Sequence, residues 1–199
     1  MLRRAIGDKI FSLNVDEVTH QVYEGPYIHK YWVDKELNRN CLMVLASTLS
    51  IICSDRSEYW TWAEEEESCY PSNVNLHVAR LNYVCWLDIK GKCKTSVLSQ
   101  RTMYDVAIVV KMSSQNYGWE MPVNLSLEFP DGNRQVRTER LDNSEKERWI
   151  PISIGKFEMT PKTIGEMSFS LTQTGNYWKS GLSVKGVIFT PTAENEQPK

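Results

Sequence analysis

The sequence predicts an all-β fold, an antiparallel β-sandwich or jelly roll with an N-terminal arm. Three observations predict it: apolar and polar residues alternate in several short stretches, turn-forming residues separate these stretches, and helical spacing is nearly absent. About seven or eight strands with turns between them fit two packed antiparallel sheets. The 199 residues, of which 41% are hydrophobic, suffice for one large domain with a buried core.

The sequence predicts three parts: an arm at 1–30, a β-sandwich domain at 31–191 and a flexible tail at 192–199. The arm mixes glycine, proline and charged residues and shows no sustained period. The strand pattern begins with "KYWVDKELNRNCLMVLASTLSII". Within the domain only residues 75–82, "NLHVARLN", could form a short helix, and the arm could form another.

The clearest strands are residues 103–112, "MYDVAIVVKM", and 123–129, "VNLSLEF", in which every second residue is apolar. "PDGN" after the second predicts a hairpin turn, because Gly132 can adopt the positive φ that such a turn needs. The segments "WIPISI", "EMSFSL" and "GLSVKGVIF" continue the alternation. Gly186 stands where the apolar phase changes, which predicts a bulge.

Composition narrows the function classes. A formal net charge of -2 offers no bulk attraction to nucleic acid or anionic membranes. The longest apolar stretch is too short to span a bilayer, and no secretory signal is evident, so we expect a cytoplasmic protein. Lys90, Lys92 and Lys94 alternate along a strand, and this local basic patch leaves an association with RNA open.

The cysteines and histidines do not have metal-ligand spacing, so we expect neither a metal site nor a cofactor. Most of the five cysteines are expected to be buried thiols. Cys69 lies in the polar segment "ESCYPSN" and is the candidate for an intermolecular disulfide. The sequence contains no nucleophile motif and no evident carboxylate pair, so we predict that the protein is not an enzyme.

The stretch "CSDRSEYWTW" gathers three aromatic rings where a strand meets a loop. An aromatic ring can stack on the apolar face of a sugar while polar groups bind its hydroxyls, so we predict that this cluster binds a sugar. Trp62 is equally consistent with core packing, and Trp86 is expected in the core. The acidic run 64–67 is expected to be a solvated loop, with the rim of the pocket as the alternative.

Four stretches carry a more specific signal: "KYWVDKELNRNCLMVLASTLSIICSDRSEYWTW", "NYVCWLDIKGKCKTSVLSQRTMYDVAIVVKM", "YGWEMPVNLSLEFPDG" and "YWKSGLSVKGVIFTP". In this order they resemble phloem protein 2, a family of plant sieve-element lectins. The resemblance implies a non-catalytic β-sandwich lectin for N-acetylglucosamine oligomers (chitooligosaccharides) and the N-glycan cores of glycoproteins. It further implies a homodimer in phloem cells that acts in wound sealing and defence, with other phloem proteins as further partners.

The resemblance also implies site residues. Trp60 matches a binding tryptophan, whereas Cys53 stands where the family usually has a second one. Glu166 matches one binding acid, and Gln173 replaces another. Trp178 and Lys179 could close the site or form a structural corner. We therefore expect weakened or altered glycan binding; the alternative is a structural or RNA-associated phloem protein with weak or lost sugar binding.

Overall fold

The computed structural model describes residues 22–24, 29–67, 74–142 and 144–193. Its strands, in chain order, are β1 (Val22–Glu24), β2 (His29–Asp34), β3 (Arg39–Leu45), β4 (Ser50–Ile51), β5 (Trp60–Glu67), β6 (Val74–Leu81), β7 (Leu87–Lys94), β8 (Met103–Tyr117), β9 (Val123–Glu128), β10 (Arg134–Glu139), β11 (Trp149–Glu158), β12 (Glu166–Gln173) and β13 (Ser180–Pro191). The described residues also form three one-turn 3-10 helices: η2 (Ala46–Thr48), η3 (Thr95–Val97) and η4 (Pro161–Thr163).

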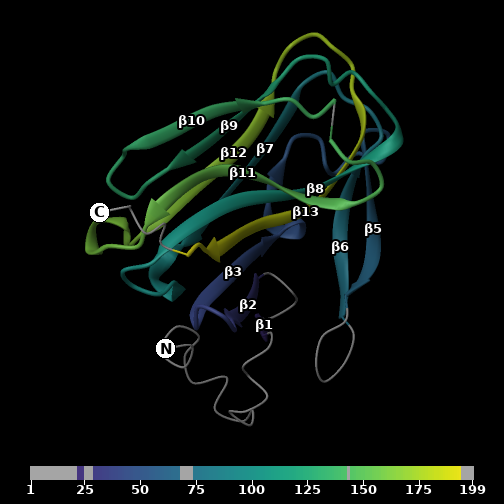
Figure 1. Ribbon diagram of the computed structural model, residues 1–199. Helices are drawn as coiled ribbons and strands as arrows, with labels where there is room; N and C mark the ends of the chain where they lie inside the picture. Colours follow the sequence, from purple (N-terminus) through teal and green to yellow (C-terminus); the bar gives the residue numbers. More distant parts are fainter. Residues whose placement is uncertain (1–21, 25–28, 68–73, 143, 194–199) are drawn as a thin grey trace.

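The strands form two sheets that pack face to face (Figure 1). The smaller sheet has the order β10-β9-β12-β7-β4. In the larger sheet β13 pairs with β8, which pairs with β11, while the other edge of β13 is shared by β3 and β6. All of these strand pairs are antiparallel, which confirms the predicted antiparallel β-sandwich.

One apolar core fills the space between the sheets, and the predicted alternation supplies it. Every second residue of β8 in the predicted stretch is buried, as expected: Tyr104, Val106, Ile108, Val110 and Met112. The apolar face of β9 is buried in the same way. A second, smaller cluster of Met43, Leu45 and Leu76 lies on the opposite face of the larger sheet.

The predicted turn and bulge are both present. Gly132 has a φ of 84°, and its N–H donates to Phe129 O at 2.9 Å where β9 turns into β10. Gly186 has a φ of 154° and sits at the register shift of β13 against β8. A Cβ at Gly186 would lie 2.2 Å from Val44 O, so a side chain there is excluded by the neighbouring strand.

Several sequence-based expectations need correction. The segment 75–82 is not helical but forms most of β6, whose apolar residues face both ways: Leu81 faces the main core and Leu76 the outer cluster. Apolar residues on both faces of a strand imitate helical spacing. The described residues also contain thirteen strands rather than seven or eight.

Within residues 1–30, β1 and the first residues of β2 are described, and they pair with each other. Residues 1–21 of the arm and 194–199 of the tail lie outside the described residues. Within the described part of the chain, no helix has the length and apolar character needed to cross a membrane.

Candidate functional site

Exposed aromatic side chains gather at one end of the sandwich, on the loops that join its strands. We call this the aromatic end and define it by five side chains that are each between 41% and 58% exposed: Tyr83, Trp86, Tyr117, Tyr177 and Trp178. They come from the β6–β7 loop, the end of β8 and the β12–β13 loop, which rises at the top of Figure 1. Large apolar rings this exposed are uncommon and often mark a binding surface.

Ring contacts connect part of this surface. The Tyr83 and Trp178 centroids lie 5.6 Å apart with the ring planes inclined at 53°. Tyr59 also contacts Tyr83, in a T-shaped arrangement with 5.7 Å between the centroids. Tyr59 itself packs against the core, so it anchors the row of three rings. Mutual ring packing lowers the entropy that the exposed rings would lose on binding a ligand.

Trp60 lies directly below this end but is enclosed, with 1% of its surface exposed. Its indole N–H donates to Ile52 O at 3.0 Å. The prediction that Trp60 stacks on a sugar is therefore wrong for this structure. Trp60 pairs with Leu81 of β6 and turns its ring inward, so the ring fills part of the core between the two sheets.

Trp62 is 38% exposed, and its indole N–H donates to Ser54 O at 3.1 Å. The indoles of Trp60 and Trp62 thus donate hydrogen bonds to the backbone carbonyls of the residues before and after Cys53. Cys53 is partly exposed and has a φ of 57°, a conformation that non-glycine residues adopt only at some cost in energy. The two indoles therefore fix the turn at Cys53, and Trp62 keeps part of its ring accessible.

Gln173 and Lys179, both predicted to bind sugar, are buried, with 5% and 0% of their surface exposed. Gln173 Nε2 donates to Met121 O at 2.8 Å, while its Oε1 is buried without a hydrogen-bond partner in the described residues. Lys179 Nζ donates to two backbone carbonyls, those of Cys85 and Tyr177. The prediction that these two side chains contact a sugar is therefore not met, because buried atoms do not reach a ligand. Both side chains instead bind backbone carbonyls and have a structural role.

Glu166 does not join the aromatic end. It begins β12, whereas Gln173 ends the strand, and seven steps of a strand separate the two by about 23 Å. The Glu166 carboxylate is exposed and forms a 3.1 Å ion pair with Lys92. It lines a cavity of about 420 Å³ together with Tyr31 and His29. One monosaccharide therefore cannot contact residues 166 and 173 together.

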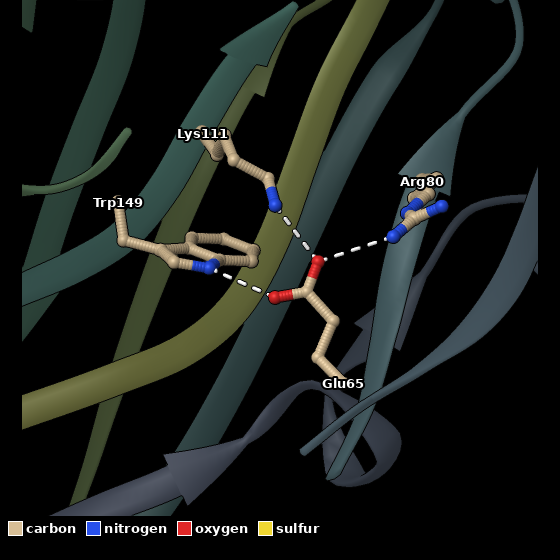
Figure 2. Close-up of polar contacts among 4 residues, drawn as sticks. All are labelled: Glu65, Arg80, Lys111 and Trp149. Carbon is tan, nitrogen blue, oxygen red and sulfur yellow. Dashed lines mark hydrogen bonds and ion pairs between the residues drawn. The ribbon is translucent and has the colours of Figure 1, made fainter. Parts of the chain in front are cut away.

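The acidic run 64–67 is not a loop or a pocket rim but part of β5. Figure 2 shows Glu65 on the outer face of the larger sheet, where its carboxylate accepts hydrogen bonds from Lys111 at 2.8 Å, Trp149 at 2.9 Å and Arg80 at 3.1 Å. Burial alone would raise the pKa of Glu65, but these donors outweigh it and hold the pKa below its ordinary value. The run therefore serves the fold rather than the aromatic end.

The comparison with protein families decides the family. The sequence model of phloem protein 2 matches residues 39–191 of the chain. The chain belongs to the phloem protein 2 family. It is 38% identical over 192 residues to the protein PHLOEM PROTEIN 2-LIKE A1 of Arabidopsis thaliana, covering 92% of this chain and 76% of that one.

Two further comparisons concern one named lectin and one solved structure. This phloem protein 2 family member is 36% identical over 177 residues to a lectin of Luffa acutangula, covering 88% of this chain and 82% of the lectin. A solved structure, the C-terminal family 22 carbohydrate binding module of Clostridium thermocellum Xyn10B, aligns with a TM-score of 0.38 and 9% identity, covering 90% of this chain and 97% of the module.

Sequence reasoning missed most rings of the aromatic end. It placed Trp86 in the core, yet Trp86 is 56% exposed. The period of β7 carries the correct signal: Leu87, Ile89 and Cys93 face inward, so position 86 has the opposite parity and faces outward. Tyr83 shows no such signal, because it lies in an irregular loop.

Proposed function

We propose that this phloem protein 2 family member is a non-catalytic lectin that binds oligomers of N-acetylglucosamine, including the cores of N-glycans, at its aromatic end. The observation that carries the proposal is the contacting pair Tyr83 and Trp178, both exposed, with Trp86 exposed on the adjoining loop. The rings of N-acetylglucosamine present C–H faces that stack on such side chains, and the acetamide and hydroxyl groups then meet the surrounding backbone amides and carbonyls.

The relatives support the same proposal. Two of them, from Luffa acutangula and Coccinia grandis, are named lectins, at 36% and 26% identity. Neither name refers to a catalysed reaction, which agrees with a binding protein. By family membership we also propose that the protein acts in the cytoplasm of phloem cells, in wound sealing and defence, as a homodimer.

The site in this chain differs from the one that the resemblance implies. Trp60 is enclosed and Cys53 carries no ring, so the stacking surface consists of Trp178, Trp86 and Tyr83, with Trp62 partly accessible beside the Cys53 turn. A surface built from these rings gives a wide platform with few charged groups. We therefore propose modest affinity for single sugars and higher affinity for oligomers that cover several rings.

An RNA-associated role has less physical support. Lys90 forms an ion pair with Asp88 at 2.6 Å, and Lys92 forms one with Glu166 at 3.1 Å. Two of the three lysines in the basic patch are therefore already neutralised by carboxylates. Binding to phosphates would need to replace these ion pairs and would weaken steeply with added salt.

The test is calorimetric titration of chitotriose into the wild-type protein and three variants. Trp178→Ala and Trp86→Ala should each weaken binding about tenfold, which corresponds to about 1.4 kcal/mol. Ile164→Ala is the matched control, because Ile164 is also a large exposed apolar residue (46%) but lies just before Glu166 at the opposite end. A wild-type protein that binds neither chitotriose nor chitin would overturn the proposed function.

A further inference from the structure

Two loops of the aromatic end are joined at a single backbone pair. Val84 and Lys179 exchange two hydrogen bonds, with N···O distances of 3.0 and 2.8 Å. This pair connects the β6–β7 loop, which carries Tyr83 and Trp86, to the end of the β12–β13 loop, which carries Trp178. The relative placement of the exposed rings therefore depends on contacts at this junction.

The side chain of Lys179 adds a second connection. Lys179 is fully buried, and its Nζ donates to Cys85 O at 2.6 Å and to Tyr177 O at 2.8 Å. A carbonyl oxygen lies in the peptide plane that leads to the next residue. The two acceptors therefore belong to the peptides that precede Trp86 and Trp178, one in each loop.

Within the described residues, the acceptors of the Lys179 ammonium group are backbone carbonyls, and no carboxylate pairs with it. Desolvating an ammonium group is costly, and burial lowers the pKa of Lys179 accordingly. Two carbonyl acceptors offset part of that cost. A methionine would fill similar volume without burying a charge, so a purely packing role does not explain a lysine at this position.

We propose that Lys179 is the positioning residue of the sugar site: its buried ammonium group orients Trp86 and Trp178 together by holding the peptide that precedes each ring. This inference rests on the proposed function, since it names the group that assembles the same site. Lys179 does not contact the sugar. The two loops thus form one binding surface for a chitooligosaccharide rather than two independent ones.

The test replaces Lys179 by methionine, which keeps the length of the side chain and removes both donated hydrogen bonds. We compare Lys179→Met with Lys92→Met, because Lys92 is exposed and paired with Glu166 at the far end of the sandwich. Nuclear magnetic resonance of the tryptophan indole N–H groups reports each ring separately, with signals assigned by single Trp→Phe variants. Chitotriose affinity is measured on the same samples, well below the unfolding temperature.

We expect Lys179→Met to shift the indole signals of Trp86 and Trp178, to leave that of Trp149 in place and to weaken chitotriose binding at least tenfold. Lys92→Met should change neither signals nor affinity. A merely structural role would lower the unfolding temperature while leaving the ring signals and the affinity of the folded protein unchanged, and that result would overturn the proposal.

Two further outcomes are also decisive. If Lys179→Met does not fold, amide hydrogen exchange of the wild-type protein is measured with and without chitotriose: joint protection of residues 82–86 and 175–179 supports the proposal, and protection of one loop alone overturns it. If the wild-type protein binds no sugar, the proposed function fails, while the indole signals of Lys179→Met still show whether the ammonium group orients both rings.

Discussion

Glu65 and Trp149 lie 84 residues apart in the chain, yet Glu65 Oε2 accepts a 2.9 Å hydrogen bond from Trp149 Nε1 (Figure 2). Glu65 belongs to β5 at one edge of the larger sheet and Trp149 to β11 at another, with β6, β13 and β8 between them. Three intervening strands would hold flat edges about 19 Å apart. The contact therefore shows that this sheet curves strongly and that its outer face is concave.

This contact predicts a large stabilising role for Glu65. Glu65→Gln removes the charge that Lys111, Trp149 and Arg80 share and leaves the half-buried Lys111 ammonium uncompensated. We expect the free energy of unfolding to fall by about 2 kcal/mol in urea titrations. Glu64→Gln is the control, because the neighbouring Glu64 carboxylate is 61% exposed and should contribute little. Equal losses from the two variants would contradict this role.

The same carboxylate predicts a pH dependence. The pKa of Glu65 in the folded protein lies below its ordinary value of 4.5, so the ionised group stabilises the fold above that pH. Its contribution is lost as the pH falls through the folded-state pKa. The difference in unfolding free energy between wild type and Glu65→Gln should thus be constant above about pH 5 and shrink below it. A difference that grows on acidification would refute the assignment.

Substitutions at two glycines test how much the bulge in β13 depends on Gly186. Gly132, in the β9–β10 turn, is the matched control. Both have positive φ, at 154° and 84°, but a Cβ at Gly186 would meet Val44 O at 2.2 Å, whereas one at Gly132 would have nothing within 4 Å. We expect Gly132→Ala to cost about 1 kcal/mol and Gly186→Ala at least twice as much. Thermal unfolding measures the loss of stability in both variants. A smaller loss for Gly186→Ala than for Gly132→Ala would show that β3 moves to make room for the added methyl group.

The cysteines should differ in reactivity. Burial, followed by the charge of Asp34, raises the pKa of Cys41 to about 12, and burial with the charge of Glu166 raises that of Cys93 to about 12. Cys53 and Cys85 are partly exposed. In a Cys69→Ser variant, two thiols should react with a disulfide reagent at pH 8 in the native state and four after unfolding. Four fast thiols in the folded protein would contradict the buried positions.

Cys69 itself lies outside the described residues, so its proposed intermolecular disulfide stays a prediction. Non-reducing electrophoresis of the wild type against Cys69→Ser, after mild oxidation, tests it. A multimer band that persists in the variant would exclude Cys69 as the linking residue.

Local alternation predicted the sandwich well, because a strand with one buried face repeats its apolar residues every second position whatever its partners are. Local alternation failed to predict side chains whose partners lie far away in the sequence. The run 64–67 gave no hint that Glu65 would bind Lys111, which is 46 residues further along the chain. The local sequence likewise does not show that Lys179 is buried, because one of its acceptors, Cys85 O, lies in another loop.

The aromatic end likewise could be predicted from the sequence only in part. The cluster at 59–62 predicted surface rings, but Trp60 fills the core, and the rings that define the aromatic end come from other segments. Strand parity identifies Trp86 as exposed. Only the fold reveals that Tyr83 and Trp178 meet, because they are brought together by the pairing of Val84 with Lys179.

The most direct test of sugar binding at the aromatic end is a titration of the ¹⁵N-labelled protein with chitotriose while the indole N–H signals are followed. We predict that the signals of Trp86 and Trp178 move in a saturable way, and that those of the enclosed Trp60 and of Trp149 on the outer face of the larger sheet stay in place. Movement of the Trp60 signal without that of Trp178, or no movement at any ring, would contradict a sugar site at the aromatic end.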